Sequence, residues 1–310
     1  MSEKLALGII SGTGWRASEI ADIARAAEDA GFAAIFCTEV NNDSIATALV
    51  MGLATRCIIV GSWVADIYLR LPYLCAKEAI IAADATGGRF ILGLGVSHQP
   101  VNRALGIEMP DPKDALRKYT VEVANWLRGE GPATHFPQQP SPYLVPIYLA
   151  ALTSQSVELA GEVADGVMPL WWSAERVARS QRWVECGRGK SGGRGHLEMT
   201  LGLPTYIGDD MDTLRNAARA NLGFFTGLPF FQRLMRASGF VLEADKAEQG
   251  AGGDALSDNL LDAICLLGPV SRCRARLAEY REAGLDLPIL WPAMGIDSAR
   301  EVIAAFHGSG

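Results

Sequence analysis

The stretch CIIVGSWVADIYLRLPYLCAKEAIIAADATGGRFILGLGVSHQ, residues 57–99, decides the fold class. It begins with an apolar, β-branched strand that breaks at Gly61 and continues into a helix that opens after Pro72. Gly87 stops this helix, and residues 90–94 form a second apolar strand. Neither strand alternates apolar with polar residues, which is typical of strands covered on both faces of a parallel sheet. The stretch therefore predicts a βαβ unit.

Two tripeptides follow these strands at their carboxyl ends, Ser62-Trp63-Val64 and Val96-Ser97-His98. Parallel strands place their carboxyl ends on one edge of the sheet, and in α/β folds that edge carries the ligand site. We therefore expect a functional site at this edge.

The alternation of strand and helix continues along the whole chain. Strands are predicted at residues 5–10, 34–37, 58–60, 90–94, 146–149, 166–168, 197–207 and 288–291. Helices are predicted at residues 17–30, 44–54, 72–86, 114–127, 154–163, 211–225, 228–238, 270–283 and 298–306, with a further one ending at residue 267; glycine-rich loops are predicted at 188–194 and 247–254. About eight strands with alternating helices favour an α/β fold, the (β/α)8 TIM barrel with insertions, over a doubly wound open sheet. No linker interrupts the pattern, so residues 1–310 are predicted to form a single domain.

Composition narrows the class of protein. Hydrophobic residues at 49% and charged residues at 20% predict a soluble protein with a large core. A net charge of -7 argues against a nucleic-acid partner, because such proteins carry a clustered basic face. The sequence has no run of 18 apolar residues and no signal-peptide pattern, so we expect a cytoplasmic protein without a membrane partner. The six cysteines lie far apart, which predicts buried free thiols.

Few residues are candidates for chemistry. The four histidines are scattered, so no metal site is predicted and the chemistry points to an organic cofactor. His98 follows a strand at its carboxyl end, where it either handles a proton or forms a simple hydrogen bond. Glu39 has the same kind of location after the strand at residues 34–37, and it is either an acid of the site or a helix-capping or salt-bridged structural residue.

Residues 149–154 form a candidate anion site. Small residues at a strand's carboxyl end lead into a helix opened by Thr or Ser, and the free backbone N–H groups of such a helix start can hold the phosphate of a cofactor. The alternative, in which Thr153 or Ser154 merely caps the helix, has equal weight. The G-x-G of GGRFILGLGVSH lacks the third glycine of a dinucleotide fingerprint, so a nucleotide-binding turn there is rejected.

The chain resembles the bacterial luciferase-like superfamily, and within it the deazaflavin-dependent (coenzyme F420) oxidoreductases. Three stretches carry this resemblance: GSWVADIYLRLP, GGRFILGLGVSHQPVNRALGI and PIYLAALTSQSVELAGEVADGV. NLGFFTGLP, SDNLLDAICLLG and AEYREAGLDLPIL continue it in the order of the family, so that it covers most of the chain.

The resemblance implies a (β/α)8 barrel whose deazaflavin or flavin lies at the carboxyl ends of the strands. It implies a cis peptide bond that backs the ring system, at Trp63-Val64 or, as the adjacent possibility, at Ser62-Trp63. It also implies a cofactor phosphate on residues 151–153 and a homodimer. The implied cofactor-binding residues are Gly61, Ser62, Trp63, Val64, Val96, Ser97, Ala150, Ala151, Leu152 and Thr153. Together with Trp63, the residues expected to line the substrate pocket are Trp15, Trp171 and Trp172.

Several positions depart from characterised subgroups. In methylenetetrahydromethanopterin reductases a glutamate ends strand one, where this chain has Ile10, and His98 replaces their acid after strand four. In the sugar-phosphate dehydrogenases of the superfamily a histidine follows the acid after strand two, where this chain has Val40. Residues 170–173 also lack the phosphate-gripping Thr and Lys of those enzymes. Neither substrate carries over to this chain.

Three functional hypotheses remain. The first is an oxidoreductase that transfers a hydride between coenzyme F420 and a small apolar or aromatic molecule, with His98 as proton donor and Glu39 as second choice. The second keeps the barrel but is an FMN-dependent luciferase-like monooxygenase that uses reduced flavin and oxygen. The third is a non-catalytic cofactor-binding protein. Titration with each cofactor distinguishes them.

Overall fold

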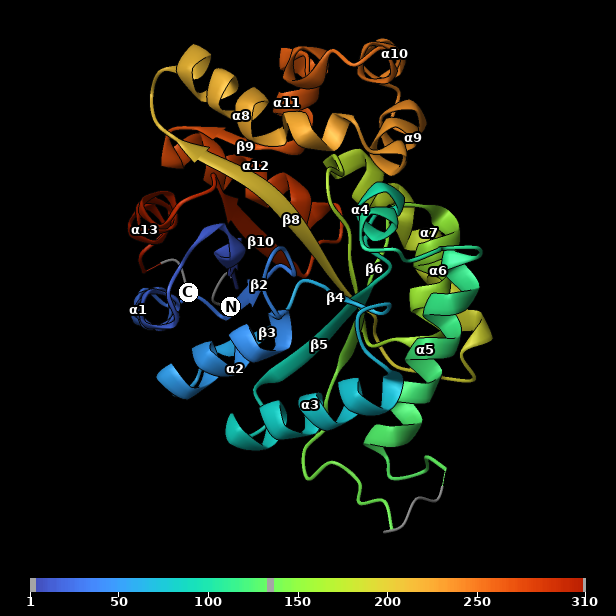
Figure 1. Cartoon of the computed structure of the whole chain (residues 1–310). Helices are drawn as coiled ribbons and strands as arrows, with labels where there is room; N and C mark the ends of the chain where they lie inside the picture. The colour runs from blue at the N-terminus through green and yellow to red at the C-terminus, as the bar shows by residue number, and fades with distance from the viewer. Residues whose placement is uncertain (1–3, 133–136, 309–310) are drawn as a thin grey trace.

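The computed structural model describes residues 4–132 and 137–308, and its centre is a parallel β-barrel surrounded by helices (Figure 1). The strands are β1 (Ala6–Ile9), β2 (Ala34–Cys37), β3 (Ile59–Ser62), β4 (Ala65–Asp66), β5 (Phe90–Gly95), β6 (Ile147–Ala150), β7 (Gly166–Met168), β8 (Glu198–Ile207), β9 (Leu266–Gly268) and β10 (Leu287–Pro292). All pairings among these strands are parallel.

Eight of the strands close into a barrel in the order β10-β1-β2-β3-β5-β6-β7-β8, and the pairing of β8 with β10 completes the ring. The register Ala6↔Ile289 joins β1 to β10, and the register Leu287↔Thr200 joins β10 to β8. The predicted (β/α)8 barrel is therefore confirmed. β4 lies outside the ring order, because the chain bulges after β3 and then pairs with the end of β5.

Helices form the outer layer of the barrel (Figure 1). They are α1 (Ala17–Asp29), α2 (Ser44–Ala54), α3 (Pro72–Ala85), α4 (Gln99–Ala104), α5 (Pro112–Leu127), α6 (Ser154–Val163), α7 (Ala174–Lys190), α8 (Met211–Thr226), α9 (Pro229–Ala237), α10 (Val241–Glu248), α11 (Asp258–Ile264), α12 (Val270–Glu282) and α13 (Ile296–Ala305), with short 3-10 turns η1 (Ser11–Thr13) and η2 (Gly252–Ala255). Consecutive helices of the layer pack on one another, as α1 does on α2 and α6 on α7.

Side chains fill the interior of the barrel, as expected for strands that are apolar on both faces. Trp63 is the largest of them near the bulge; it is 6% exposed and its ring meets that of Trp291 edge to face at 5.6 Å. A Cβ on Gly8 would lie 2.5 Å from the Trp63 ring, and one on Gly202 would lie 2.3 Å from it. Glycine at both positions makes the room that this indole needs.

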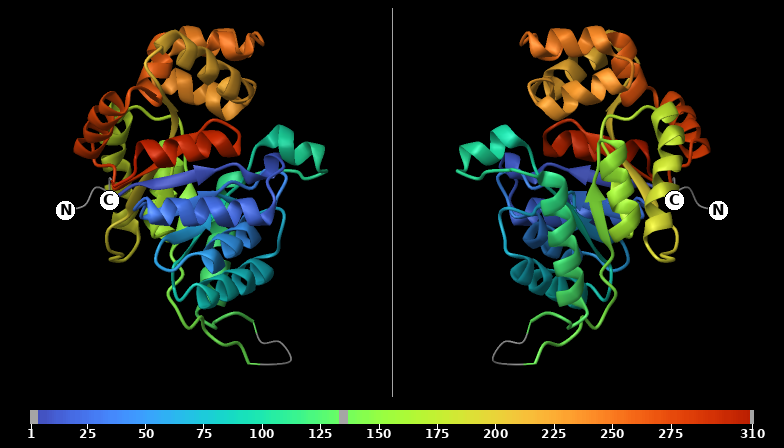
Figure 2. Two further views of the ribbon diagram at one scale, coloured as in Figure 1. Left: turned by 90° about the vertical axis from the view of Figure 1, so that its left-hand side faces the viewer. Right: turned by 90° about the vertical axis from the view of Figure 1, so that its right-hand side faces the viewer.

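A helical insertion, α8–α11, forms a separate layer at one end of the molecule, whereas residues 137–142, which precede β6, lie at the opposite end (Figures 1 and 2). At the end of this insertion, one prediction from the sequence is wrong. The helix predicted to end at residue 267 ends at Ile264, and Leu266–Gly268 is strand β9. The reason is that β8 continues beyond the barrel wall and offers an edge, with which these three residues pair from Thr205↔Leu266 to Ile207↔Gly268.

Other local predictions also needed correction. β3 does not break at Gly61; the strand passes through this residue because its backbone packs against Phe36 and the Ile91 carbonyl oxygen, where a Cβ would not fit. The loop predicted at 188–194 begins inside α7, since the Arg188 guanidinium ties the end of that helix to carbonyl oxygens of residues 161, 164 and 196. α10 overlaps the start of the loop predicted at 247–254. Four cysteines are buried thiols, but Cys57 and Cys186 are exposed.

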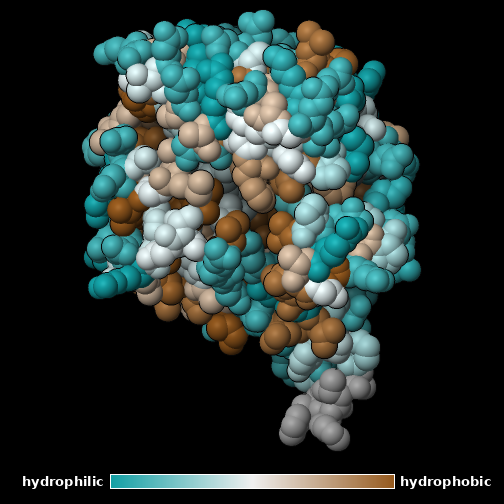
Figure 3. All heavy atoms as spheres, turned by 45° about the horizontal axis from the view of Figure 1, so that its top comes forward, coloured by the Kyte–Doolittle hydropathy of each residue, from teal (hydrophilic) through white to brown (hydrophobic). Residues whose placement is uncertain are grey.

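The face shown in Figure 3 is hollowed near its centre, and apolar side chains are visible in the hollow. None of the helices in the described part of the chain is both long and apolar enough to cross a membrane. Among residues 4–132 and 137–308, no group of three or more His, Cys, Asp or Glu side chains is arranged to hold a metal ion.

Candidate cofactor and active site

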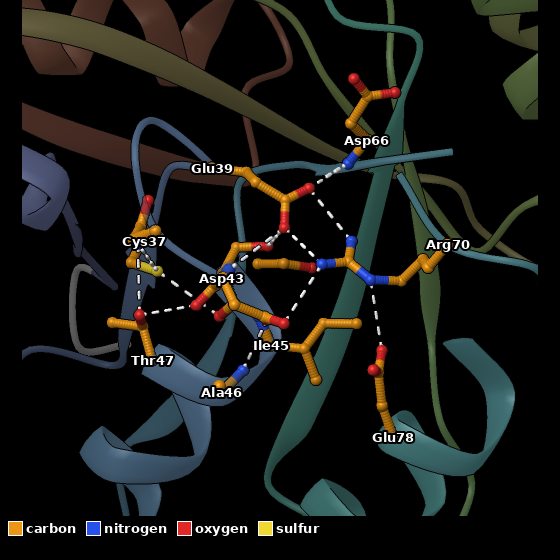
Figure 4. Close-up of polar contacts among 12 residues, drawn as sticks. Cys37, Glu39, Asp43, Ile45, Ala46, Thr47, Asp66, Arg70 and Glu78 are labelled. Carbon is orange, nitrogen blue, oxygen red and sulfur yellow. Dashed lines mark hydrogen bonds and ion pairs between the residues drawn. The ribbon is translucent and has the colours of Figure 1, made fainter. Parts of the chain in front are cut away.

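A buried ion pair lies in the loops that follow β2 and β4 (Figure 4). The Glu39 carboxylate accepts hydrogen bonds from both terminal nitrogens of Arg70, with 3.0 Å from Nη1 to Oε2, and the two side chains are 4% and 7% exposed. Glu39 also accepts from the backbone N–H of Asp66 and from the N–H and hydroxyl of Ser44. Arg70 in turn contacts the carboxylates of Asp43 at 3.4 Å and Glu78 at 3.2 Å. Burial is the largest single influence on Arg70 and opposes its charge, but the hydrogen bonds with Glu39 and the nearby charges of Glu39 and Asp43 together outweigh burial and raise the pKa of the guanidinium.

This geometry favours the structural alternative for Glu39. The Glu39 carboxylate accepts five hydrogen bonds, two of them from a buried guanidinium, so both of its oxygens are engaged within the protein itself. Its contacts instead fix the chain of β4 against the end of β2. Glu39 is therefore a salt-bridged residue that joins the loops after β2 and β4.

Asp66 is a buried acid that the sequence analysis missed. It is 6% exposed and ends β4, and its Oδ1 accepts from the backbone N–H of Tyr68 at 2.9 Å. Figure 4 shows its carboxyl group turned away from Glu39 and Arg70. Burial and, to a smaller extent, the Glu39 charge raise the pKa of Asp66, and they outweigh the lowering effect of the Arg70 charge and of hydrogen bonds from Tyr68 and Ser97. No sequence motif indicates Asp66 as a site residue. The signal in the sequence was its position two residues after the expected cis peptide bond.

Replacing Asp66 with asparagine should stabilise the fold at neutral pH. The folded pKa of Asp66 is raised, so the folded state binds this proton more tightly than the unfolded state does. Stability is then lost as the pH rises from the unfolded pKa through the folded one. The uncharged amide of the variant would avoid this loss while still accepting from Tyr68. Urea unfolding should show an advantage of Asp66→Asn at pH 7 that shrinks toward pH 4.

The control for this experiment is Asp210→Asn. Asp210 caps α8 in an exposed position, and its hydrogen bonds with Thr213 lower its pKa. Its substitution should give no stabilisation at pH 7. If both variants changed stability with pH in the same way, Asp66 would not carry a raised pKa.

The bulge after β3 contains the backbone feature that the resemblance implies: the peptide bond between Trp63 and Val64 is cis. Val64 packs against Gly95 of β5, since a Cβ on Gly95 would lie 2.4 Å from the Val64 side chain; the same Cβ would lie 3.2 Å from the Ala150 side chain at the end of β6. Gly93 is similarly close to Val64, at 3.1 Å from a built Cβ. The bulge, β5 and the end of β6 thus meet in one tightly packed surface at the carboxyl ends of the strands.

Two neighbours of the bulge face the barrel wall and interior. The Ser62 hydroxyl donates to the carbonyl oxygen of Gly93 and accepts from its N–H, both at 2.9 Å, so it bridges β3 and β5 in a fully buried position. Trp63 lies inside the barrel, as described above. The side chains of Ser62 and Trp63 are buried and contact other residues of the protein. Val96 and Ser97, just after the end of β5, are only half-buried. Ser97 has a left-handed φ of 56°, uncommon for a residue with a side chain.

The loop from β6 to α6 has the form expected of an anion site. β6 ends at Ala150, Ala151 is 2% exposed, and Thr153 is the N-cap of α6. The hydroxyl of Thr153 accepts from the N–H of Ser156, and the Ser156 hydroxyl accepts from the N–H of Thr153, so the capping alternative is confirmed. The next N–H groups of the first turn have no partner within the helix. Capping and anion binding are therefore compatible at this helix start.

His98 follows β5 and opens α4 as its N-cap residue, without a side-chain capping bond. Its ring is half-buried and packs against Phe231 at 5.7 Å and Phe230 at 6.2 Å, both from α9. Its Nδ1 is buried and has no hydrogen-bond partner among the described residues. Burial lowers the pKa of His98, so the ring is neutral at pH 7 and is able to accept a proton.

An aromatic cluster covers this end of the barrel. Trp171, three residues after the end of β7, packs on Phe231 at 4.8 Å and on Phe225 at 5.7 Å, and Phe225 packs on Trp291 at 5.5 Å. Trp171 is 2% exposed and has a left-handed φ of 58°. We call Trp171, Phe225, Phe231 and Trp291 the aromatic cluster. His98 lies at its edge through Phe231.

The three tryptophans expected in the pocket lie in different places. Trp171 belongs to the aromatic cluster, but Trp172 is fully buried beside Trp183 in a separate layer. Trp15 lines a small cavity with the ends of β1 and β10. That cavity and another beside Trp171 each measure about 10 Å³, room for a water molecule. Neither of these two cavities is lined by Glu39, Trp63, His98 or Ala151.

Unpartnered polar atoms gather at the same end of the barrel. Within the described residues, the buried atoms without a hydrogen-bond partner include Thr38 Oγ1, Tyr68 OH, His98 Nδ1 and Trp171 Nε1. These residues follow β2, β4, β5 and β7, at the carboxyl end in each case. Buried polar atoms are almost always hydrogen-bonded, so their grouping fits a site that a polar ligand completes.

These features define a class of protein: a closed (β/α)8 barrel with a cis-peptide bulge and a capped helix start at the carboxyl ends of its strands. The chain belongs to the luciferase-like monooxygenase family, whose model matches residues 6–287. It is an oxidoreductase, as its relatives are.

Two relatives match almost the whole chain. A Mycobacterium tuberculosis protein whose name places it among the coenzyme F420-dependent oxidoreductases is 26% identical over 87% of this chain and 89% of its own length. The 5,10-methylenetetrahydromethanopterin reductase of Methanolobus tindarius is 27% identical over 92% of this chain and 93% of its own length.

Solved structures show the same fold. The coenzyme F420-dependent tetrahydromethanopterin reductase of Methanopyrus kandleri superposes with a TM-score of 0.82 over 98% of both chains, at 18% identity. The oxygenating constituent of 3,6-diketocamphane monooxygenase from Pseudomonas putida, in complex with FMN, superposes with a TM-score of 0.71 at 15% identity, over 99% of this chain and 96% of that one.

Proposed function

We propose that the protein transfers a hydride between coenzyme F420 and a small apolar or aromatic organic molecule. The observation that carries the proposal is the bulge after β3, whose Val64 packs against Gly95, and Gly95 in turn lies beside Ala150 at the start of the loop at 150–153. The Mycobacterium tuberculosis relative is named for F420 chemistry, which supports this cofactor over FMN.

Different residues at the carboxyl ends of the strands hold different parts of the cofactor. Val64 and Gly95 form an apolar support for a planar ring, and the first turn of α6 offers N–H groups to its phosphate. A deazaflavin, when bound, supplies or accepts a hydride and reacts poorly with oxygen. The protein's own part is to orient the two partners and exclude water, for which the aromatic cluster is suited.

His98 is the proposed proton-handling residue. Its ring stands beside the aromatic cluster, and its unpartnered Nδ1 is free to bond a substrate oxygen or nitrogen. Because burial favours the neutral ring, His98 suits proton acceptance during substrate oxidation and gives the proton back during reduction. Asp66, held near Ser97, replaces Glu39 as the second acid of the site.

Titration of the purified protein with F420 and with FMN, followed by tryptophan fluorescence, tests the proposal. We expect tighter binding of F420, with hydride transfer to or from an apolar ketone, aldehyde or alcohol panel under anaerobic conditions. Oxygen consumption with reduced FMN would show a monooxygenase instead. Tight binding without turnover of any donor would indicate a binding protein.

A further inference from the structure

Arg176 is a buried cation next to the anion loop. It is the third residue of α7 and is 6% exposed. Its Nη2 donates to the Leu152 carbonyl oxygen at 2.9 Å, and Nη1 makes long contacts of 3.4 Å with the Ala237 carbonyl oxygen and the Ser238 hydroxyl. Its Nε is buried without a partner among the described residues. The guanidinium therefore touches the residue that immediately precedes the N-cap of α6.

No carboxylate neutralises this charge within the described residues. The rings of Trp172 and Trp183 lie 5.2 and 5.5 Å from the guanidinium carbon, and the hydrogen-bond acceptors are all neutral. Arg70, in contrast, meets three carboxylates. Burial and the nearby Arg179 lower the pKa of Arg176 to about 10, so it stays charged at pH 7. A buried, unneutralised cation is costly, and an anion bound close by would offset the cost.

The anion loop is where such a ligand is expected. We propose that Arg176 is the counter-charge for the phosphate of the bound cofactor, acting from behind the loop at 150–153 while the first N–H groups of α6 contact the phosphate directly. This inference rests on the proposed function. Arg176 is a positioning residue in this scheme, because it acts through the Leu152 carbonyl and through its charge.

The test compares cofactors with and without the phosphate. Dissociation constants are measured by fluorescence for F420 against its phosphate-free ribityl deazaflavin, and for FMN against riboflavin. Wild type should prefer the phosphate-bearing member of each pair, with a preference that falls as salt is added. Arg176→Gln removes the charge but keeps an amide donor for Leu152, and we expect it to reduce the preference roughly tenfold. Arg176→Lys should keep most of it.

The matched control is Arg188→Gln. Arg188 also bonds to backbone carbonyl oxygens, but those of residues 161, 164 and 196, away from the anion loop. The Arg188→Gln variant should therefore keep the wild-type preference for the phosphate-bearing cofactors. The inference is overturned if wild type shows no phosphate preference, or if Arg176→Gln weakens both members of a pair equally. If wild type binds none of the four compounds, the proposed function itself fails, and the two failures are therefore distinguishable.

Discussion

Replacing His98 with alanine is expected to slow turnover by about 100- to 10,000-fold, the range that general acid–base catalysis contributes. Cofactor affinity should change little, because the proposed cofactor contacts come from the bulge at Trp63-Val64, from β5 and from the start of α6. A loss of kcat with unchanged cofactor binding marks an interaction made in the transition state. Steady-state assays and cofactor titration of the same samples measure the two effects.

His98→Gln separates the proton from the hydrogen bond. Glutamine fills more of the space against Phe230 and Phe231 than alanine does, and it can donate a hydrogen bond but cannot take up the proton. His196→Ala is the control, since His196 pairs with Asp286 in an exposed position. Wild-type turnover by both His98 variants, in an assay limited by hydride transfer, would reduce His98 to a structural residue.

The second large effect is on stability. Arg70→Met should lower the free energy of unfolding by about 3–5 kcal/mol, because removing one partner of a buried ion pair leaves an uncompensated charge. Here the remaining charges are the carboxylates of Glu39, Asp43 and Glu78. Since whole domains are stable by about 5–15 kcal/mol, the loss should be evident in urea unfolding at pH 7.

Arg117→Met serves as the matched control for this experiment. Arg117 pairs with Glu162, but the two side chains are 37% and 25% exposed, so their pair should contribute at most about 1 kcal/mol. The double variant Glu39→Gln/Arg70→Met should recover part of the stability that Arg70→Met loses. If Arg70→Met and Arg117→Met lowered the free energy of unfolding equally, the pairing of Glu39 with Arg70 would not stabilise the fold. Glu39 would then again be a candidate acid of the site.

Much of the barrel could be predicted because its signals are local. Apolar strands such as Ala34–Cys37 and Phe90–Gly95, each followed by a helix, show their periodicity within a few residues. The position of the cis bond came from the resemblance of GSWVADIYLRLP to a family, and the structure has the bond at the implied peptide. β9 was missed because three residues carry too little pattern, and their strand depends on the overhanging edge of β8.

By itself, the sequence determined the barrel, the loops at its carboxyl ends and the helix start at Thr153. The tertiary structure decided which charged side chains there have an ion-pair partner and which do not. Glu39 is neutralised by Arg70, thirty-one residues away, whereas Asp66 and Arg176 are buried without an ion-pair partner among the described residues. The physical reason is that burial and charge pairing depend on residues brought together from distant strands, and no local pattern encodes which partner will be within reach.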